Sequence, residues 1–290
     1  MSSFSIPRIL LLLGLLSLSS IAFCQTLQYT TLQVSPYHYT AAYGVNNLGD
    51  IVGVYSPNGF ASGFLYSKGN LQRLVCSGVN NTYAAGINDN GVIVGWCTPK
   101  GQGFIYQNGA YTFVAYPKAK FTSLAGINNK SEIVGNYMGS GPKQIQRGFV
   151  YANGTFTLLP SGVTANGINN NGTIAGLSCS RQVCSSVLLT KGAKGWRVQE
   201  TVVYPGAANT YLSGINDNGD LAGDWTSGPN VPAQAFVYLK STNKFVSLNF
   251  NNNDNFAIAG GINNSGEIVG EYAESNGNGG VINGFYGTLQ

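Results

Sequence analysis

The chain has 290 residues, enough for one or two domains with a large core. Only 9% of the residues are charged, whereas 40 glycines and 32 asparagines make up nearly a quarter of the chain. The apolar share of 43% excludes a disordered chain, and a formal net charge of +4 without any basic run argues against nucleic acid as a partner.

Residues 1–24 have the features of a cleaved signal peptide. The apolar stretch from Ile9 to Phe23 follows a basic residue and is too short for a membrane span. Ala22 and Cys24 fit the small residues of a cleavage site, so Gln25 is expected to begin the mature chain. A lipoprotein signal that uses Cys24 is the second interpretation, because Phe23 stands where such signals have a small residue. We expect an exported protein that is secreted, periplasmic or at the cell surface.

Residues 27–34, LQYTTLQV, predict a single strand directly after the leader. They resemble the strands that close the repeated units described next, although no unit precedes them. Their partner must therefore come from elsewhere in the chain.

The rest of the chain consists of six repeated units. Each unit opens with a motif of the form GINNxGxIVG, and successive motifs are 42, 40, 41, 47 and 47 residues apart. The motifs read GVNNLGDIVG from Gly44, GINDNGVIVG from Gly86, GINNKSEIVG from Gly126, GINNNGTIAG from Gly167, GINDNGDLAG from Gly214 and GINNSGEIVG from Gly261. A strand with a Gly-Phe or Ala-Phe pair follows in five units, and the fourth unit has SVLL at this place.

The opening motif predicts a β-hairpin. Its asparagine can accept a hydrogen bond from the backbone two residues on, and the glycine three residues later suits a left-handed turn position. Ser131 replaces this glycine in the third unit and should be strained by roughly 1 kcal/mol. The turn makes the residue after the leading glycine pair with the first residue of IVG, as Val45 with Ile51. Because the next residue is apolar too, both faces of this second strand are predicted to be buried.

Four short strands in each unit predict an all-β, six-bladed β-propeller with four-stranded antiparallel blades. The sixth unit stops after its third strand, so we expect residues 27–34 to complete it and close the ring. The strands are about half the length that an outer-membrane barrel needs, and no membrane insertion is expected. Residues 25–290 should form this single domain, and we expect a monomer.

The tandem GINNxGxIVG units, each followed by a Phe-containing strand, resemble the HAF family of bacterial extracellular repeat proteins. The resemblance covers nearly all of residues 28–287 and implies secretion and a repeat fold. Where that family reads His-Ala-Phe, this chain has Gly-Phe or Ala-Phe, so any role of the family's histidine is absent. The resemblance implies no activity and no catalytic residues.

The loop between the second and third strands varies in length from unit to unit, which indicates that a ligand-binding face lies on that side of the propeller. Aromatic residues at its base are the candidate ligand-binding residues: Tyr55, Trp96, Tyr137, Trp225 and Tyr272. Asp224 and Glu271 stand beside two of them and are the weak candidates for catalytic residues. The simpler interpretation is that the aromatic residues cover the blade ends and the acids are solvated.

No metal or other cofactor is expected. The turn residues Asp89 and Asp217 suggest calcium, but these turns are too short and too rich in asparagine to bring several carboxylates together. His38 is the single histidine and is expected at the surface, so neither a zinc set nor a Ser-His-Asp triad is predicted.

Four cysteines, Cys76, Cys97, Cys179 and Cys184, remain after cleavage. An even number in an exported chain indicates disulfides, and three pairings remain open. A bridge between blades from Cys76 to Cys97 is compatible with the repeats, as is a bridge from Cys179 to Cys184 within one loop.

Three functions remain open at this stage. The first is a secreted, non-catalytic binding or scaffold module whose partner is an extracellular glycan or protein. The second is a glycoside hydrolase or lyase that uses Asp224 and Glu271 as paired carboxylates. The third is a structural protein of the envelope or matrix. Fold alone does not distinguish them, so the sequence leaves open whether the protein is an enzyme and favours the binding role.

Overall fold

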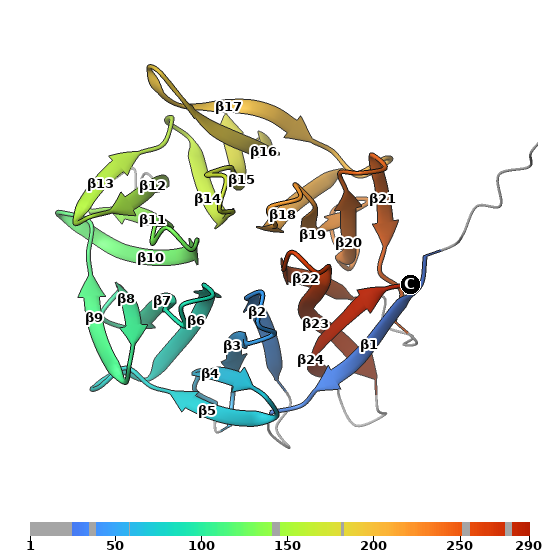
Figure 1. Cartoon of the computed structure of the whole chain (residues 1–290), viewed down its shortest axis with the longest axis horizontal. Helices are drawn as coiled ribbons and strands as arrows, with labels where there is room; N and C mark the ends of the chain where they lie inside the picture. The colour runs from blue at the N-terminus through green and yellow to red at the C-terminus, as the bar shows by residue number, and fades with distance from the viewer. Residues whose placement is uncertain are drawn as a thin grey trace, which may run out of the picture.

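The computed structural model describes residues 25–34, 39–57, 59–140, 146–180, 183–250, 256–275 and 280–290. They form six four-stranded antiparallel sheets around one axis, which is a six-bladed β-propeller (Figure 1). The predicted fold class is confirmed. The predicted signal peptide, residues 1–24, and His38 lie outside the described residues. Among the residues described, no helix is long and apolar enough to cross a membrane.

Each blade is a meander whose first strand lies nearest to the axis (Figure 1). Blade 1 contains β2 (Thr40–Val45), β3 (Ile51–Tyr55), β4 (Ser62–Ser67) and β5 (Asn70–Leu74). Blade 2 contains β6 (Asn81–Ile87), β7 (Ile93–Thr98), β8 (Gln102–Gln107) and β9 (Ala110–Val114). Blade 3 contains β10 (Ala119–Ile127), β11 (Ile133–Gly139), β12 (Gln146–Ala152) and β13 (Thr155–Leu158).

The other three blades follow in chain order. Blade 4 contains β14 (Val163–Ile168), β15 (Ile174–Ser180), β16 (Val183–Gly192) and β17 (Gly195–Val202). Blade 5 contains β18 (Asn209–Ile215), β19 (Leu221–Thr226), β20 (Gln234–Leu239) and β21 (Lys244–Ser247). Blade 6 contains β22 (Ala257–Ile262), β23 (Glu267–Ser275), β24 (Gly280–Leu289) and β1 (Leu27–Leu32). Strands β16 and β24 have 10 residues each and are longer than the sequence predicts.

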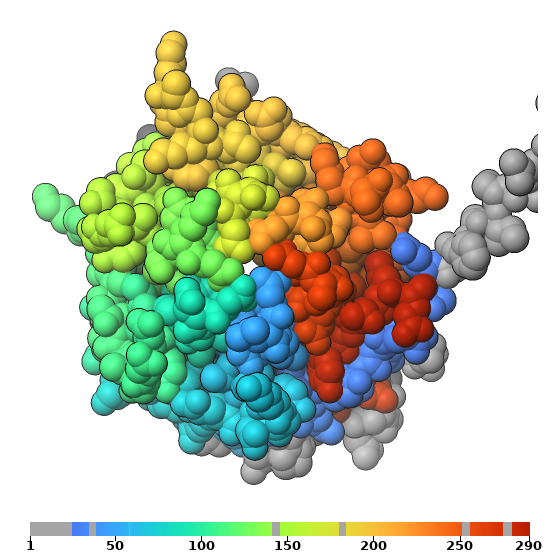
Figure 2. Space-filling model, in the orientation of Figure 1, coloured from blue at the N-terminus to red at the C-terminus, as the bar shows by residue number. Residues whose placement is uncertain are grey.

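The two ends of the chain close the ring in the predicted way. Strand β1 pairs antiparallel with β24 over six residue pairs, from Leu27 with Leu289 to Leu32 with Gly284. Figures 1 and 2 show the blue N-terminal strand beside the red C-terminal strand. The outer strand of blade 6 is therefore supplied by the opposite end of the chain, and the six blades meet around the axis without a gap in their order.

The hairpin turns also have the predicted geometry. Val45 pairs with Ile51, and the equivalent aliphatic pair occurs in every blade. The Oδ1 of Asn46 accepts hydrogen bonds from the backbone N–H groups of Leu48 and Asp50. Ser131 has a φ of 60° where the other five turns place a glycine with positive φ. The strained serine predicted for the third unit is thus present.

The same asparagines also join the blades to one another. The side-chain Nδ2 of each donates to the backbone carbonyl of the next, at 2.9–3.1 Å. The members, in ring order, are Asn46, Asn88, Asn128, Asn169, Asn216 and Asn263, and the last donates to the first. We call this closed circle the asparagine ring. All six residues are buried, so each bond replaces contacts with water that these groups have lost.

The core between the blades depends on the Gly-Phe strands. Five phenylalanines at this place are fully buried: Phe64, Phe104, Phe149, Phe236 and Phe285. Each ring lies against the glycine of the IVG motif. A Cβ on Gly95 would come within 2.8 Å of Phe104 and 1.9 Å of the Tyr83 carbonyl oxygen. Blade 4 has the smaller Val187 opposite its glycine, in agreement with its degenerate motif.

Aromatic stacks link the end of one blade to the second strand of the next. Tyr116 stacks on Tyr137 with ring centroids 3.9 Å apart and an interplanar angle of 9°. The pairs Tyr204–Trp225 and Phe250–Tyr272 stack in the same way, at 4.4 and 4.9 Å. Between blades 1 and 2 the equivalent positions hold the disulfide of Cys76 with Cys97. A covalent bond therefore stands where three other blade junctions use stacked rings.

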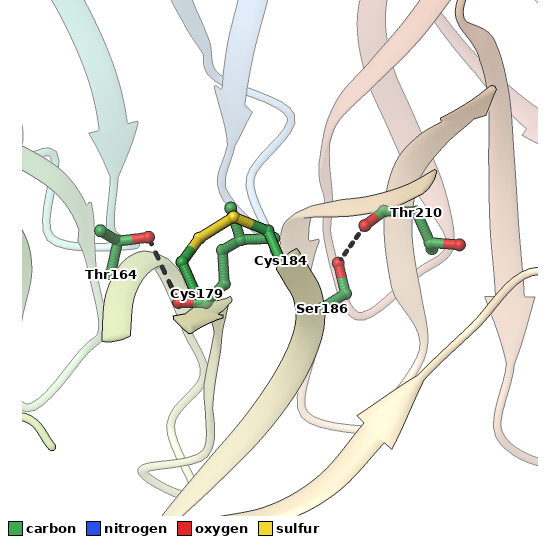
Figure 3. Close-up of a disulfide and its surroundings, with 6 residues drawn as sticks. Thr164, Cys179, Cys184, Ser186 and Thr210 are labelled. Atoms are coloured by element: carbon green, nitrogen blue, oxygen red, sulfur yellow. Dashed lines mark hydrogen bonds between the residues drawn. A yellow bond between two sulfur atoms is a disulfide. The ribbon is translucent and has the colours of Figure 1, made fainter. Parts of the chain in front are cut away.

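The second disulfide joins Cys179 to Cys184 where β15 and β16 pair in blade 4 (Figure 3). Near it, the Ser186 hydroxyl donates to the Thr210 carbonyl oxygen of blade 5 at 2.7 Å, which ties the two blades together (Figure 3). Both disulfides are pairings that the repeats allow.

Candidate functional site

A bulge in each innermost strand shapes the inside of the ring. In β2, Ala42 pairs with Gly53 and Gly44 pairs with Val52, so Tyr43 is an extra residue between them. The same shift recurs in every blade. The six extra residues line the axis: Tyr43, Ala85, Ala125, Asn166, Ser213 and Gly260. Four of them are small, and this leaves room on the axis.

The room on the axis is a cavity of about 280 Å³, partly open to solvent. Trp96, Ile258 and Glu271 complete its lining together with the six extra residues. Trp96 and Glu271 follow the glycine of the IVG motif in their second strands, on the side that leads to the loops between second and third strands, so the cavity faces those loops. This is the side on which the sequence predicts a ligand. Parts of those loops lie outside the described residues.

Trp96 and Glu271 occupy equivalent positions in their blades, directly after the glycine of the IVG motif. Asn136 and Asp224 hold the same position in blades 3 and 5. The Asn136 amide donates to the carbonyl oxygen of Ala165 and accepts from its N–H, at 2.8 and 2.9 Å. This position therefore points toward the innermost strand of the next blade, which brings Asp224 toward blade 6 and Glu271 toward blade 1.

Glu271 is the acid that lines the cavity. Its side chain is 9% exposed, and its Oε2 has no hydrogen-bond partner among the described residues. Burial raises the pKa of Glu271 to about 7, although a hydrogen bond from Tyr39 acts in the opposite direction. Burial, and then the nearby Glu271 carboxylate, raise the pKa of Asp224 to about 7 as well. Near neutral pH these two acids therefore share less than two full negative charges.

Two tyrosines of blade 1 accompany Glu271. The hydroxyls of Tyr39 and Tyr43 lie 3.3 Å apart. Burial and then Glu271 raise the pKa of Tyr39 to about 12, and burial and then Tyr39 raise the pKa of Tyr43 still further. Both phenols remain protonated and neutral at physiological pH. Trp96 is half-buried and stacks on Tyr83, with ring centroids 5.0 Å apart.

The candidate residues from the sequence divide into two groups. Tyr137, Trp225 and Tyr272 stack between blades, and Tyr55 is buried against Phe64. Trp96 lines the cavity, together with Glu271. Sequence reasoning missed Tyr43 and Asn166, whose exposure to the axis depends on the bulge.

The turns at the opposite end form a second circle. The backbone N–H of one residue in each turn donates to the side-chain oxygen of the equivalent residue in the next blade, at 2.7–2.9 Å. The members, in ring order, are Asn47, Asp89, Asn129, Asn170, Asp217 and Asn264. Each aspartate also accepts amide hydrogen bonds from the asparagines on both sides. The aspartates therefore hold turns together, and the described residues contain no group of three or more potential metal ligands.

Comparison with known proteins identifies the fold. A putative gluconolactonase shares 12% sequence identity and a TM-score of 0.56, with 91% of this chain and 93% of that chain covered. Virginiamycin B lyase from Staphylococcus aureus shares 11% identity and a TM-score of 0.52, with 92% and 100% covered. TolB from Acinetobacter baumannii shares 13% identity and a TM-score of 0.55, with 73% of this chain and 55% of that chain covered.

These similarities show the propeller fold alone. Lactonases, lyases and TolB proteins share it, so it does not assign one chemistry to this chain. No protein-family model and no curated protein matches the chain in sequence.

Proposed function

We propose that the protein is an extracytoplasmic binding module that holds a sugar residue of a glycan in the axial cavity. The observation that carries this proposal is the cavity itself, where the Trp96 indole lies near the polar side chains of Asn166, Ser213 and Glu271. Sugar rings stack an apolar face on aromatic side chains and form hydrogen bonds with their hydroxyls. The volume of about 280 Å³ suits one small group or a chain end.

Three features support the extracytoplasmic location. Residues 1–24 have the pattern of a signal peptide. The four remaining cysteines lie in two disulfides, which persist in oxidising compartments. The repeats resemble those of the HAF family of extracellular proteins. Each blade keeps its outer strand as a free edge, which has four to six residues in five of the six blades, and such short edges favour a monomer.

The proposal is tested on a glycan array with the purified protein. The wild type should retain a defined set of glycans, and Trp96→Ala should lose most of this signal, because it removes the ring that faces the cavity. Phe113→Ala is the matched control, since Phe113 is 44% exposed on the outer strand β9. Circular dichroism checks that both variants are folded. Absence of any glycan bound by the wild type would remove the carbohydrate part of the proposal.

The second candidate is a hydrolase or lyase that uses Asp224 and Glu271 as a general acid and a general base. The observation that favours it is that the pKa of each acid is raised to about 7, so one can be protonated while the other is ionised. Polysaccharide cleavage should then be lost in Asp224→Asn and kept in Glu200→Gln, which changes an exposed acid on β17. Full turnover by Asp224→Asn would eliminate this candidate.

A further inference from the structure

Among the described residues, the lining of the axial cavity carries an acidic group and aromatic groups and no basic group. Its lining includes Glu271, Trp96 and Tyr43, and contains no lysine or arginine among the described residues. Asp224 interacts electrostatically with Glu271 from blade 5. Tyr39 and Tyr83 interact with the same cluster from blades 1 and 2. The electrostatic potential of such a cavity favours a positively charged ligand.

The Oε2 atom of Glu271 is buried and lacks a donor among the described residues. A buried polar atom without a partner costs more than a satisfied one, and the cost is greater for a charged group. In the described part of the chain this carboxylate receives one hydrogen bond, from Tyr39. The second oxygen has no donor in the described part of the chain and can therefore accept a hydrogen bond from a ligand.

The aromatic rings suit the same kind of donor. The face of an indole or phenol ring carries partial negative charge and attracts an ammonium group. Trp96 is held in place by its stack on Tyr83, at an interplanar angle of 12°, so its orientation does not depend on the ligand. The neutral Tyr43 hydroxyl is an additional acceptor on the axis.

We propose that the ligand carries a protonated primary amine, which enters the axial cavity, donates to the Oε2 of Glu271 and lies against the rings of Trp96 and Tyr43. This inference rests on the proposed role of the cavity as a ligand site and specifies the charge of the ligand. An amine-bearing sugar at the end of a glycan fits both the proposed binding of a sugar residue and the positive charge inferred here. A primary ammonium has three N–H donors, which a quaternary ammonium lacks, and the unpartnered oxygen requires a donor.

Binding of this amine should depend on pH. The raised pKa values of Glu271 and Asp224 mean that part of the acid pair is protonated at neutral pH. The titratable groups that face Glu271 from the described residues are Asp224, Tyr39 and Tyr43, and both tyrosines stay neutral. A bound cation favours the ionised carboxylate, so binding releases protons and strengthens as the pH rises through about 7.

The test uses n-butylammonium and its neutral counterpart n-butanol as probes, measured by isothermal titration calorimetry with the whole mature protein. At pH 8 the wild type should bind the ammonium at least about tenfold more tightly than the alcohol. Glu271→Gln keeps the shape of the side chain and should lose this preference. Glu200→Gln removes an exposed charge far from the axis and should retain it.

A second series keeps the test independent of the folding of any variant. The affinity of the wild type for n-butylammonium should fall by about tenfold or more between pH 8 and pH 5, because the acids become protonated. Equal affinity for the two probes, a pH-independent affinity or no saturable binding of the ammonium overturns the inference.

Glucosamine and glucose, compared in the same way, separate this inference from the proposed function. Stronger binding of glucosamine supports both. If the protein binds neutral glycans on the array and shows no preference for either amine, the carbohydrate proposal stands and the charge of the ligand is wrong. If the ammonium binds and no glycan on the array is retained, the positive charge of the ligand is supported and the carbohydrate proposal is wrong.

Discussion

The asparagine ring makes a testable contribution to stability, and Asn88 is the cleanest position at which to perturb it. Its Nδ2 donates to the Asn128 carbonyl oxygen at 3.1 Å, and its Oδ1 accepts from the N–H groups of Asn90 and Val92. In four of the other five members of the asparagine ring, the Nδ2 also donates to an acid four residues later in the chain. The residue four positions after Asn88 is Val92, which cannot accept such a bond. Asn88→Asp keeps the shape of the side chain and replaces only the donor.

The expected loss follows from these bonds. The ionised aspartate keeps both acceptor contacts, loses one buried donor and places negative charge against a carbonyl oxygen. The Asn128 carbonyl retains a hydrogen bond from Ser131 N–H, so it is not left unsatisfied. The lost bond costs about 1 kcal/mol, and the buried charge brings the total to about 2 kcal/mol. At low pH the protonated carboxyl can donate again, so the difference from wild type should shrink.

Urea unfolding followed by tryptophan fluorescence measures this difference. With a slope of about 3 kcal/mol/M, a loss of about 2 kcal/mol lowers the midpoint by about 0.7 M at pH 7. Asn90→Asp is the control, because it places the same charge on an exposed residue of the same turn and should cost less than about 0.5 kcal/mol. If the two variants are equally stable, the side-chain bonds between blades are not what stabilises the ring.

Three further predictions address the junctions, the core and the acids. Cys97→Ala opens a bridge between residues 21 apart and should lower the free energy of unfolding by about 3 kcal/mol, measured by urea denaturation. Reducing the wild type should lower it further, because reduction also opens the bridge from Cys179 to Cys184. Phe104→Ala, at a fully buried ring, should cost about 3–5 kcal/mol, against about 2 kcal/mol for Val187→Ala at the equivalent place of blade 4, compared by thermal melting. Because the pKa of Asp224 is higher in the folded protein than in the unfolded chain, the wild type should lose stability as the pH rises from about 4 to about 7. Asp224→Asn should reduce this decline, and an unchanged pH profile of the urea midpoint would contradict the raised pKa.

The parts of the fold that local chemistry determines could be predicted from the sequence. The turn begins with an asparagine and contains a residue with positive φ, and both requirements are met within a few neighbouring residues. The pairing of Val45 with Ile51 then follows from the turn. The missing fourth strand of the last unit predicted the pairing of β1 with β24, because the last blade would otherwise lack the outer strand that the other blades have.

The features that depend on contacts between repeats could not be predicted in the same way. The role of Asn88 as a donor to the next blade is invisible in one turn, since an aspartate would open that turn equally well. The signal available was that the third position of the motif is asparagine in all six repeats and aspartate in none. Six copies of the side-chain amide are what a circle of donors and acceptors needs.

The candidate site shows a similar limit. Trp96 follows the IVG glycine directly, as Glu271 does, whereas Tyr137, Trp225 and Tyr272 come one residue later. Successive residues of a strand point to opposite faces, so the first position faces the next blade's inner strand and the second stacks on the preceding blade. The sequence grouped all these aromatics by their nearness to the loop. Counting from the glycine would have separated them.

The pairing of β1 with β24 joins residues that are more than 250 positions apart in the chain. A version of the protein that lacks residues 25–34 would present β24 as an open edge with six unmatched partners, shaped to accept one short segment. A synthetic peptide with the sequence LQYTTLQV should then bind in trans and restore the toroid. The affinity of this peptide for the shortened protein would then measure directly how strongly the pairing of β1 with β24 closes the ring.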